Sequence, residues 1–144
     1  MIIPSVRNYH AVKSEKEAIE EMKYVDGFVL VVPEKNMPAY RKMAGEAGKI
    51  WKKHGALAYI ESVGEDLNPN VPAEMKGVSF PKIAGARTGE TVVFSYILYN
   101  SRKHRDEVNA KVMKDPAMNQ WQGKDMPFDM KRAAYGGFNV IVEA

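Results

Sequence analysis

Four segments of the chain are rich in β-branched and aromatic residues and have the length of β-strands. The first two are Tyr24–Val32, which ends at Pro33, and Ala56–Gly64. The others are Thr91–Tyr99 and Lys131–Val142. Such residues suit the pleated surface of a sheet, and proline ends a strand because it has no N–H to donate. The pattern therefore predicts four strands.

Two segments between these strands have apolar residues at helical spacing. In the first, Pro38 lies in the opening turn, where its missing N–H costs little, and Gly55 ends the helix. The second runs from Ser101, a capping residue, to Lys114. The apolar face of the first helix consists of Tyr40, Met43, Ala44, Ala47, Ile50, Trp51 and His54.

The order of these elements is β-α-β-β-α-β, which predicts an α+β fold with an antiparallel sheet in the ferredoxin-like arrangement. In that arrangement the first and third strands are central and the other two form the edges. The two central segments are indeed the most continuously apolar of the four. Residues 65–90 are too many for a plain hairpin turn, so we expect a functional loop or small elements there.

Both faces of the central strands are largely apolar, although two helices can cover only one face of a sheet. On the first strand, Phe28 and Leu30 belong to one face, and Val25, Val29 and Val31 belong to the other. We expect the helices to cover the valine face, because smaller side chains leave room for them. The opposite face then needs a second copy of the sheet, which predicts a homodimer.

The first 21 residues differ from the rest of the chain. Ser14 and Glu17 form a capping-box pattern, which predicts a short polar helix over Glu15–Glu21. Few apolar residues in this segment could join a core. We therefore expect residues 1–21 to be an N-terminal extension and residues 22–144 to be the folded domain.

Composition limits the classes of function. The 144 residues are 45% hydrophobic and 27% charged, which is typical of a globular domain. There is no cysteine, and the three histidines are scattered, so we expect no metal site. The net charge of +3 comes from lysines interspersed with carboxylates, which disfavours nucleic acid as a partner. No segment has the pattern of a membrane span or a secretory signal, so we expect a cytoplasmic protein.

Several separated motifs resemble the YbaA-like proteins, a family of small bacterial proteins of unknown function. The motifs, in order, are Met22–Phe28, Val92–Tyr96, Met126–Arg132 and Gly136–Phe138. The resemblance extends over residues 22–144. It implies the dimeric α/β-barrel superfamily, in which two ferredoxin-like sheets pack face to face, and it brings no established activity.

Two titratable residues are candidate catalytic residues. Asp26 lies in the middle of an apolar central strand, where desolvation would raise its pKa. Alternatively, it pairs with Lys131 or Arg132 on the fourth strand. His54 ends the first helix, where it is either a proton shuttle beside a pocket or a cap of the last carbonyls.

Further residues are candidates for binding a substrate. Trp121 and Phe128 belong to an apolar group before the last strand, which either seals the mouth of a pocket or pins a loop. Tyr96, on the third strand, and Tyr59, on the second, are either pocket hydroxyls or residues that only pack within the sheet. Lys131 and Arg132 are the neighbouring cations of the same candidate site.

Four basic or potentially basic residues, Arg102–Arg105, crowd the first turn of the second helix, where the helix dipole disfavours positive charge. They indicate either a bound anion or charges that solvent and the acids Asp106 and Glu107 screen.

Two functions fit these observations. The first is binding or transformation of a small molecule, without a cofactor, in a pocket between sheet and helices. The second is a non-catalytic homodimer with a structural or stress-related role. RNA binding draws support only from the basic net charge.

Overall fold

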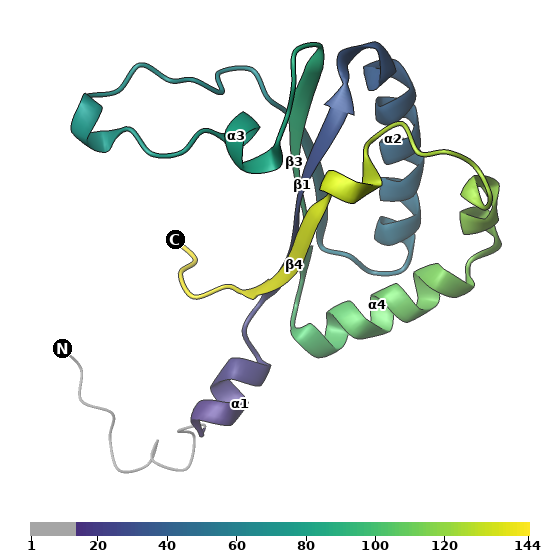
Figure 1. The fold of residues 1–144 in the computed structure, drawn as a ribbon. Helices are drawn as coiled ribbons and strands as arrows, with labels where there is room; N and C mark the ends of the chain where they lie inside the picture. The colour runs from purple at the N-terminus through teal and green to yellow at the C-terminus, as the bar shows by residue number, and fades with distance from the viewer. Residues whose placement is uncertain (1–13) are drawn as a thin grey trace.

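The computed structural model describes residues 14–144 (Figure 1). Its strands are β1 (Tyr24–Pro33), β2 (Ala58–Val63), β3 (Glu90–Tyr99) and β4 (Ala134–Asn139). They form an antiparallel sheet in the order β2-β3-β1-β4. The α+β class, the antiparallel pairing and the two central strands are therefore as the sequence predicts.

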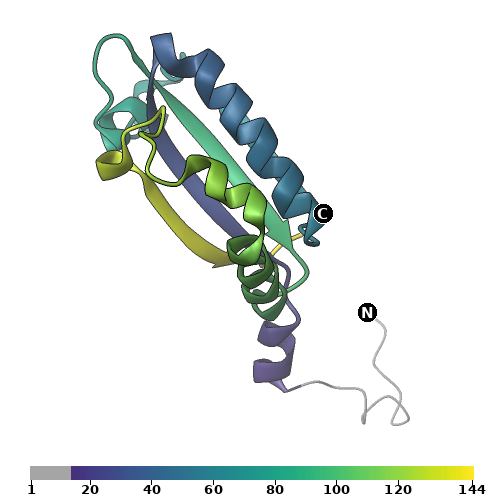
Figure 2. The same cartoon turned by 90° about the vertical axis from the view of Figure 1, so that its right-hand side faces the viewer.

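Two long helices, α2 (Met37–Lys53) and α4 (Arg102–Lys114), cover one face of the sheet (Figure 2). α2 follows a 3-10 turn, η2 (Glu34–Asn36), and the chain leaves it through Gly55 at a φ of 112°, which L side chains rarely adopt. α4 begins after Ser101, whose Oγ accepts the N–H of His104 at 3.0 Å. Both predicted helices are confirmed.

The core lies between these helices and the sheet and has two parts. Apolar side chains of β1 and β3 meet α2 alone in one part and both helices in the other. The first part contains Leu30, Val32, Tyr40, Ala44 and Val93. The second contains Tyr24, Ile50, Ala56, Ile97, Tyr99, Val108 and Val112.

The helices cover the face of β1 opposite to the one that we expected. Leu30 packs against α2, with Phe28 partly buried beside it, whereas Val25 and Val29 border a hollow on the uncovered side. The expectation that Val25, Val29 and Val31 face the helices was wrong. The size of the side chains did not predict the covered face. Asp26 lies on the same face as Phe28, and it pairs with Arg105 of α4. Because successive side chains of a strand point to opposite faces, the face of Asp26 determines the face of every other residue of β1.

The long connection between β2 and β3 contains small elements of its own, as expected. They are η3 (Ala73–Met75) and α3 (Phe80–Ala84). α3 lies on the side of the sheet away from α2 and α4 (Figure 1), and the ring of Phe80 meets that of Phe94 at 6.2 Å. Val31 and Val92, paired at this end of the central strands, are buried. The face of the sheet opposite to α2 and α4 is here called the open face, and α3 covers one end of it.

The rest of the open face is a shallow apolar hollow of about 670 Å³. Gly27 and Gly136 face each other across β1 and β4, and a Cβ at Gly27 would lie 3.4 Å from Cε2 of Phe138. Phe94 and Phe138 are 48% and 61% exposed, respectively. These two rings therefore stand on a floor of backbone and stay exposed, although Phe80 of α3 packs against Phe94.

After α4 the chain forms η4 (Pro116–Trp121) and η5 (Met130–Arg132) before it enters β4. β4 is shorter than the predicted strand Lys131–Val142. A Cβ at Gly137 would overlap the side chain of Tyr24, so the glycine allows a close approach of ring to backbone. Within the described part of the chain, no helix is both long and apolar enough to cross a bilayer.

The first helix, α1 (Glu15–Glu20), stands apart from the sheet and has no buried residue. The Oγ of Ser14 accepts the N–H of Glu17 at 3.1 Å, as the capping pattern predicts. The remainder of the predicted extension, residues 1–13, lies outside the described residues.

Removal of residues 1–21 is expected to leave the melting temperature within a few degrees of that of the full chain, because α1 contributes nothing to the two parts of the core. Thermal unfolding followed by circular dichroism measures this. A fall of more than about 10 °C would show that the segment stabilises the domain.

Candidate functional site

An apolar cavity of about 350 Å³, here called the inner cavity, lies between the sheet and α2. The stretch between α4 and β4 closes one side of it. Both tryptophans of the chain line it. Other lining residues are Phe28 and Leu30 of β1, Met43 of α2, Ser95 of β3, and Met126 and Phe128 of the closing stretch. The structure thus brings Trp121 and Phe128 to the wall of a pocket.

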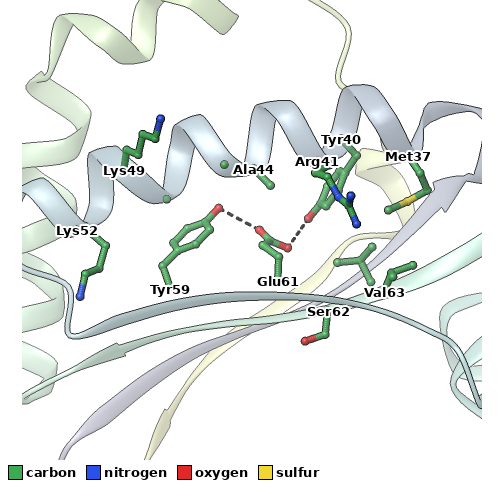
Figure 3. Close-up of a pocket in the computed structure, with 13 residues that line it drawn as sticks. Met37, Tyr40, Arg41, Ala44, Lys49, Lys52, Tyr59, Glu61, Ser62 and Val63 are labelled. Atoms are coloured by element: carbon green, nitrogen blue, oxygen red, sulfur yellow. Dashed lines mark hydrogen bonds between the residues drawn. The ribbon is translucent and has the colours of Figure 1, made fainter.

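Glu61 of β2 supplies the polar chemistry of this cavity. Its Oε2 accepts the O–H of Tyr40 at 2.7 Å, and its Oε1 accepts the O–H of Tyr59 at 3.0 Å (Figure 3). Tyr40 comes from α2 and Tyr59 from β2, so the three side chains bridge the gap between the helix and the edge strand. Each carboxylate oxygen keeps a second lone pair for another donor.

Gly48 makes this arrangement possible. A Cβ at position 48 would lie 2.8 Å from Cδ1 of Tyr59, closer than carbon atoms approach one another. The ring of Tyr59 therefore packs directly against the backbone of α2. The ring of Trp51 lies beside it, with 6.2 Å between the two centroids.

Burial and the neighbouring Glu61 both raise the pKa of Tyr40 far above the ordinary value of a phenol. The same two causes, burial first, raise the pKa of Tyr59. Both phenols therefore stay protonated at neutral pH and donate their hydrogen bonds to the side chain of Glu61. These two bonds orient the carboxylate.

A second hollow of about 490 Å³, here called the outer groove, lies between α2 and the edge strand β2 (Figure 3). Tyr40, Tyr59 and Glu61 line both hollows, so they form the boundary between them. Three exposed cations line the outer groove and not the inner cavity: Arg41, Lys49 and Lys52. The two sides of the boundary therefore differ sharply in charge.

Asp26 lies outside both hollows and is paired with a residue that the sequence did not suggest. Its Oδ1 accepts a hydrogen bond from Nη1 of Arg105 on α4 at 2.7 Å, whereas the expected partners were Lys131 or Arg132. Burial raises the pKa of the Asp26 carboxyl, and the guanidinium of Arg105 opposes that rise. The guanidinium also stands over the ring of Tyr24, 5.0 Å from its centroid.

This pairing accounts for part of the basic cluster at the start of α4. Arg105 is held by Asp26 and, through Nε, by Asp106 at 2.8 Å. Nδ1 of His104 accepts the N–H of Asn100 at 2.9 Å. Two of the four residues therefore have partners within the fold.

His54 joins the ends of two helices and lines neither hollow. Its Nε2 lies 2.7 Å from Oδ2 of Asp115, which also accepts a hydrogen bond from Nζ of Lys53 at 3.1 Å. Asp115 is buried and caps η4 through the N–H of Ala117. The geometry is that of a helix junction between α2 and α4.

The remaining predicted residues lie in different places. Tyr96 borders both the inner cavity and the hollow of the open face. Arg132 donates to Glu90 at 2.6 and 2.9 Å and to Asp129 at 2.7 Å, so it ties η5 to the start of β3. Lys131 is exposed, and neither of these two cations lines the inner cavity.

Sequence reasoning did not identify Glu61 and Tyr40 as site residues. An acid on an edge strand is typical of a solvated face, and Tyr40 fits the apolar face of its helix. The hydrogen bond between Tyr40 and Glu61 depends on the distance between α2 and β2, which the sequence does not specify. Among residues 14–144, no three acidic or histidine side chains are arranged to hold a metal ion.

Comparison with known proteins identifies the family. The family model for a protein of unknown function, DUF1428, matches residues 23–130. The chain belongs to the DUF1428 family. Protein YbaA of Escherichia coli (strain K12), described as uncharacterized, is 45% identical to it over 122 residues, which are 85% of this chain and 99% of that protein. YbaA of Shigella flexneri matches to the same extent. The resemblance to the YbaA-like proteins is therefore confirmed.

In this DUF1428 protein, Asp115→Asn is expected to lower the melting temperature at pH 7 by several degrees. The N–H of Ala117, His54 and Lys53 hold the pKa of Asp115 well below its usual value. A carboxyl whose pKa is lower in the folded state stabilises the fold above its unfolded pKa of about 3.9, and this contribution is lost as the pH falls through the folded pKa. The difference between the two proteins should therefore shrink below pH ~4.

Thermal unfolding from pH 7 down to pH 3 measures this difference. Asp125→Asn is the matched control, because Asp125 is exposed and has no ion pair among the described residues. An equal loss for Asp115→Asn at every pH would contradict an electrostatic role.

Proposed function

We propose that this protein binds a small molecule in the inner cavity. The observation that supports this is an aromatic-lined space of about 350 Å³ with a hydrogen-bonded carboxylate at its wall. Cavities of a few hundred Å³ that are mostly apolar with a few convergent polar groups are typical of ligand sites. Glu61 can accept a hydrogen bond from such a ligand directly, and we propose that no cofactor takes part.

We also propose that the domain has the ferredoxin-like arrangement and that a second copy covers its open face, as in a dimeric α/β barrel. The strand order and the helices on one face support the first part. The exposed rings of Phe94 and Phe138 support the second, because large exposed apolar patches mark interaction surfaces. A stable homodimer buries about 800 Å² on each partner.

The open face also favours the alternative function, a non-catalytic homodimer with a structural role. In that case the inner cavity is only a gap in the packing. Ligand binding and dimerisation therefore need separate tests.

The first test is titration with N-phenyl-1-naphthylamine, a neutral aromatic dye that fluoresces when it leaves water. The wild-type protein is expected to bind one dye per chain. Ala47→Phe places a ring in the inner cavity and should weaken binding at least about tenfold, or ~1.4 kcal/mol.

Ala110→Phe is the matched control, because Ala110 is exposed on α4 and lines none of the hollows described. Native mass spectrometry of the freshly purified protein would reveal a retained ligand. Equal dye binding by wild type and Ala47→Phe would favour the alternative function.

The second test is sedimentation velocity. Wild type is expected to be a dimer at micromolar concentration, and Phe94→Glu a folded monomer, because the new charge would be desolvated at the interface without a partner. Phe94 is the suitable position because it lies on the open face, whereas Phe28 packs on the helix side.

Met113→Glu is the control, because Met113 is 63% exposed on α4, which covers the opposite face. It should sediment like wild type. A wild-type protein that is monomeric at micromolar concentration would refute the dimer.

A further inference from the structure

Glu61 is the one charged side chain that lines the inner cavity, among the residues that the structure describes. The other lining residues are aliphatic, aromatic, methionine, alanine or serine side chains. A ligand that enters the cavity therefore meets a negative charge and no positive one.

The carboxylate of Glu61 is stabilised without a cation. Two phenols donate to it, and within residues 14–144 no lysine, arginine or histidine nitrogen lies within ion-pair distance of it. Four other acids with buried or half-buried side chains are each paired with a cation. They are Asp26, Glu90, Asp115 and Asp129. Glu61 is therefore available to a positively charged group from outside the fold.

Aromatic rings around the cavity add to this preference. The π face of a tryptophan, tyrosine or phenylalanine attracts a cation, most strongly where water is excluded. Rings from β1, β2, α2 and the stretch after α4 surround the space: Phe28, Tyr40, Trp51, Tyr59, Trp121 and Phe128.

The cations of the outer groove lie beyond the phenol–carboxylate boundary. Arg41, Lys49 and Lys52 are exposed, and Nζ of Lys52 donates to the carbonyl oxygen of Leu57 at 2.9 Å. An anionic ligand in the inner cavity would have Glu61 between its charge and these side chains. Repulsion from the carboxylate would then disfavour it.

We propose that the ligand of the inner cavity is an organic amine, whose protonated nitrogen donates to Glu61 and whose apolar body lies among the aromatic rings. This inference rests on the proposed function and adds the charge of the ligand to it. The amine replaces the missing cation, and the two phenols hold the carboxylate in place for it.

Three probes of similar shape test this: 4-phenylbutylamine, 4-phenyl-1-butanol and 4-phenylbutyrate, which at pH 7 are cationic, neutral and anionic. Trp51 and Trp121, the two tryptophans of the chain, both line the cavity and report binding by their fluorescence. We expect wild type to bind the amine at least about tenfold more tightly than the alcohol, and the carboxylate most weakly.

Glu61→Gln keeps the size of the side chain and removes its charge. It should weaken binding of the amine at least about tenfold and change binding of the alcohol less than about threefold. Glu65→Gln makes the same change at an exposed residue just beyond β2 that lines none of the hollows described, and it should leave all three affinities unchanged. Circular dichroism checks that each variant is folded, and the ranking of the probes by wild type is a test that needs no variant.

The outcomes separate the two proposals. Equal affinity for the three probes, or a preference for the carboxylate, would overturn the amine while leaving a ligand cavity. Absence of binding by all three probes, together with unchanged dye binding in Ala47→Phe, would overturn the proposed function itself.

Discussion

The ion pair between Asp26 and Arg105 decides which side of the sheet faces the helices. A carboxylate in the middle of a central strand loses its hydration, and it can be ionised there only where a cation reaches it. Arg105 reaches it from α4, at 2.7 Å. Because side chains alternate along a strand, Phe28, Leu30 and Val32 then face the helices and Val25 and Val29 face away. The positions of the core, the inner cavity and the open face all follow from this choice.

The helix side gains a cavity as a consequence of the side chains that it receives. Large rings from β1, β2 and α2 hold α2 away from the sheet, and the other residues between them leave part of the gap empty. Tyr59 is held against the helix backbone at Gly48, and its hydroxyl meets Glu61 on the same strand. Tyr40 completes the group from the helix. A well-packed core would contain no such space, so the polar group and the cavity are best understood together.

On the other side of the sheet, β1 presents valines and backbone surface, and β3 and β4 add the exposed rings of Phe94 and Phe138. Glycines on β1 and β4 leave a flat floor, and α3 shields only the end where Val31 and Val92 lie. The two sides therefore differ in character: one encloses a space suited to a small molecule, and the other presents a broad surface suited to a protein. Arg132 joins η5 to Glu90 at the start of β3 and lowers the pKa of Glu90 to about 2.

The sequence by itself determined the elements and their order. Residue types that favour strands, helix caps at Ser14 and Ser101, and the glycine after α2 act over a few residues, so local patterns reveal them. They also revealed the central strands, and they indicated a pocket wall at Trp121 and Phe128. Only the tertiary structure decided which face the helices cover, that Arg105 is the partner of Asp26, that His54 meets Asp115, and that Glu61 meets Tyr40. Each of these depends on contacts between residues far apart in the chain, whose distances no local pattern specifies.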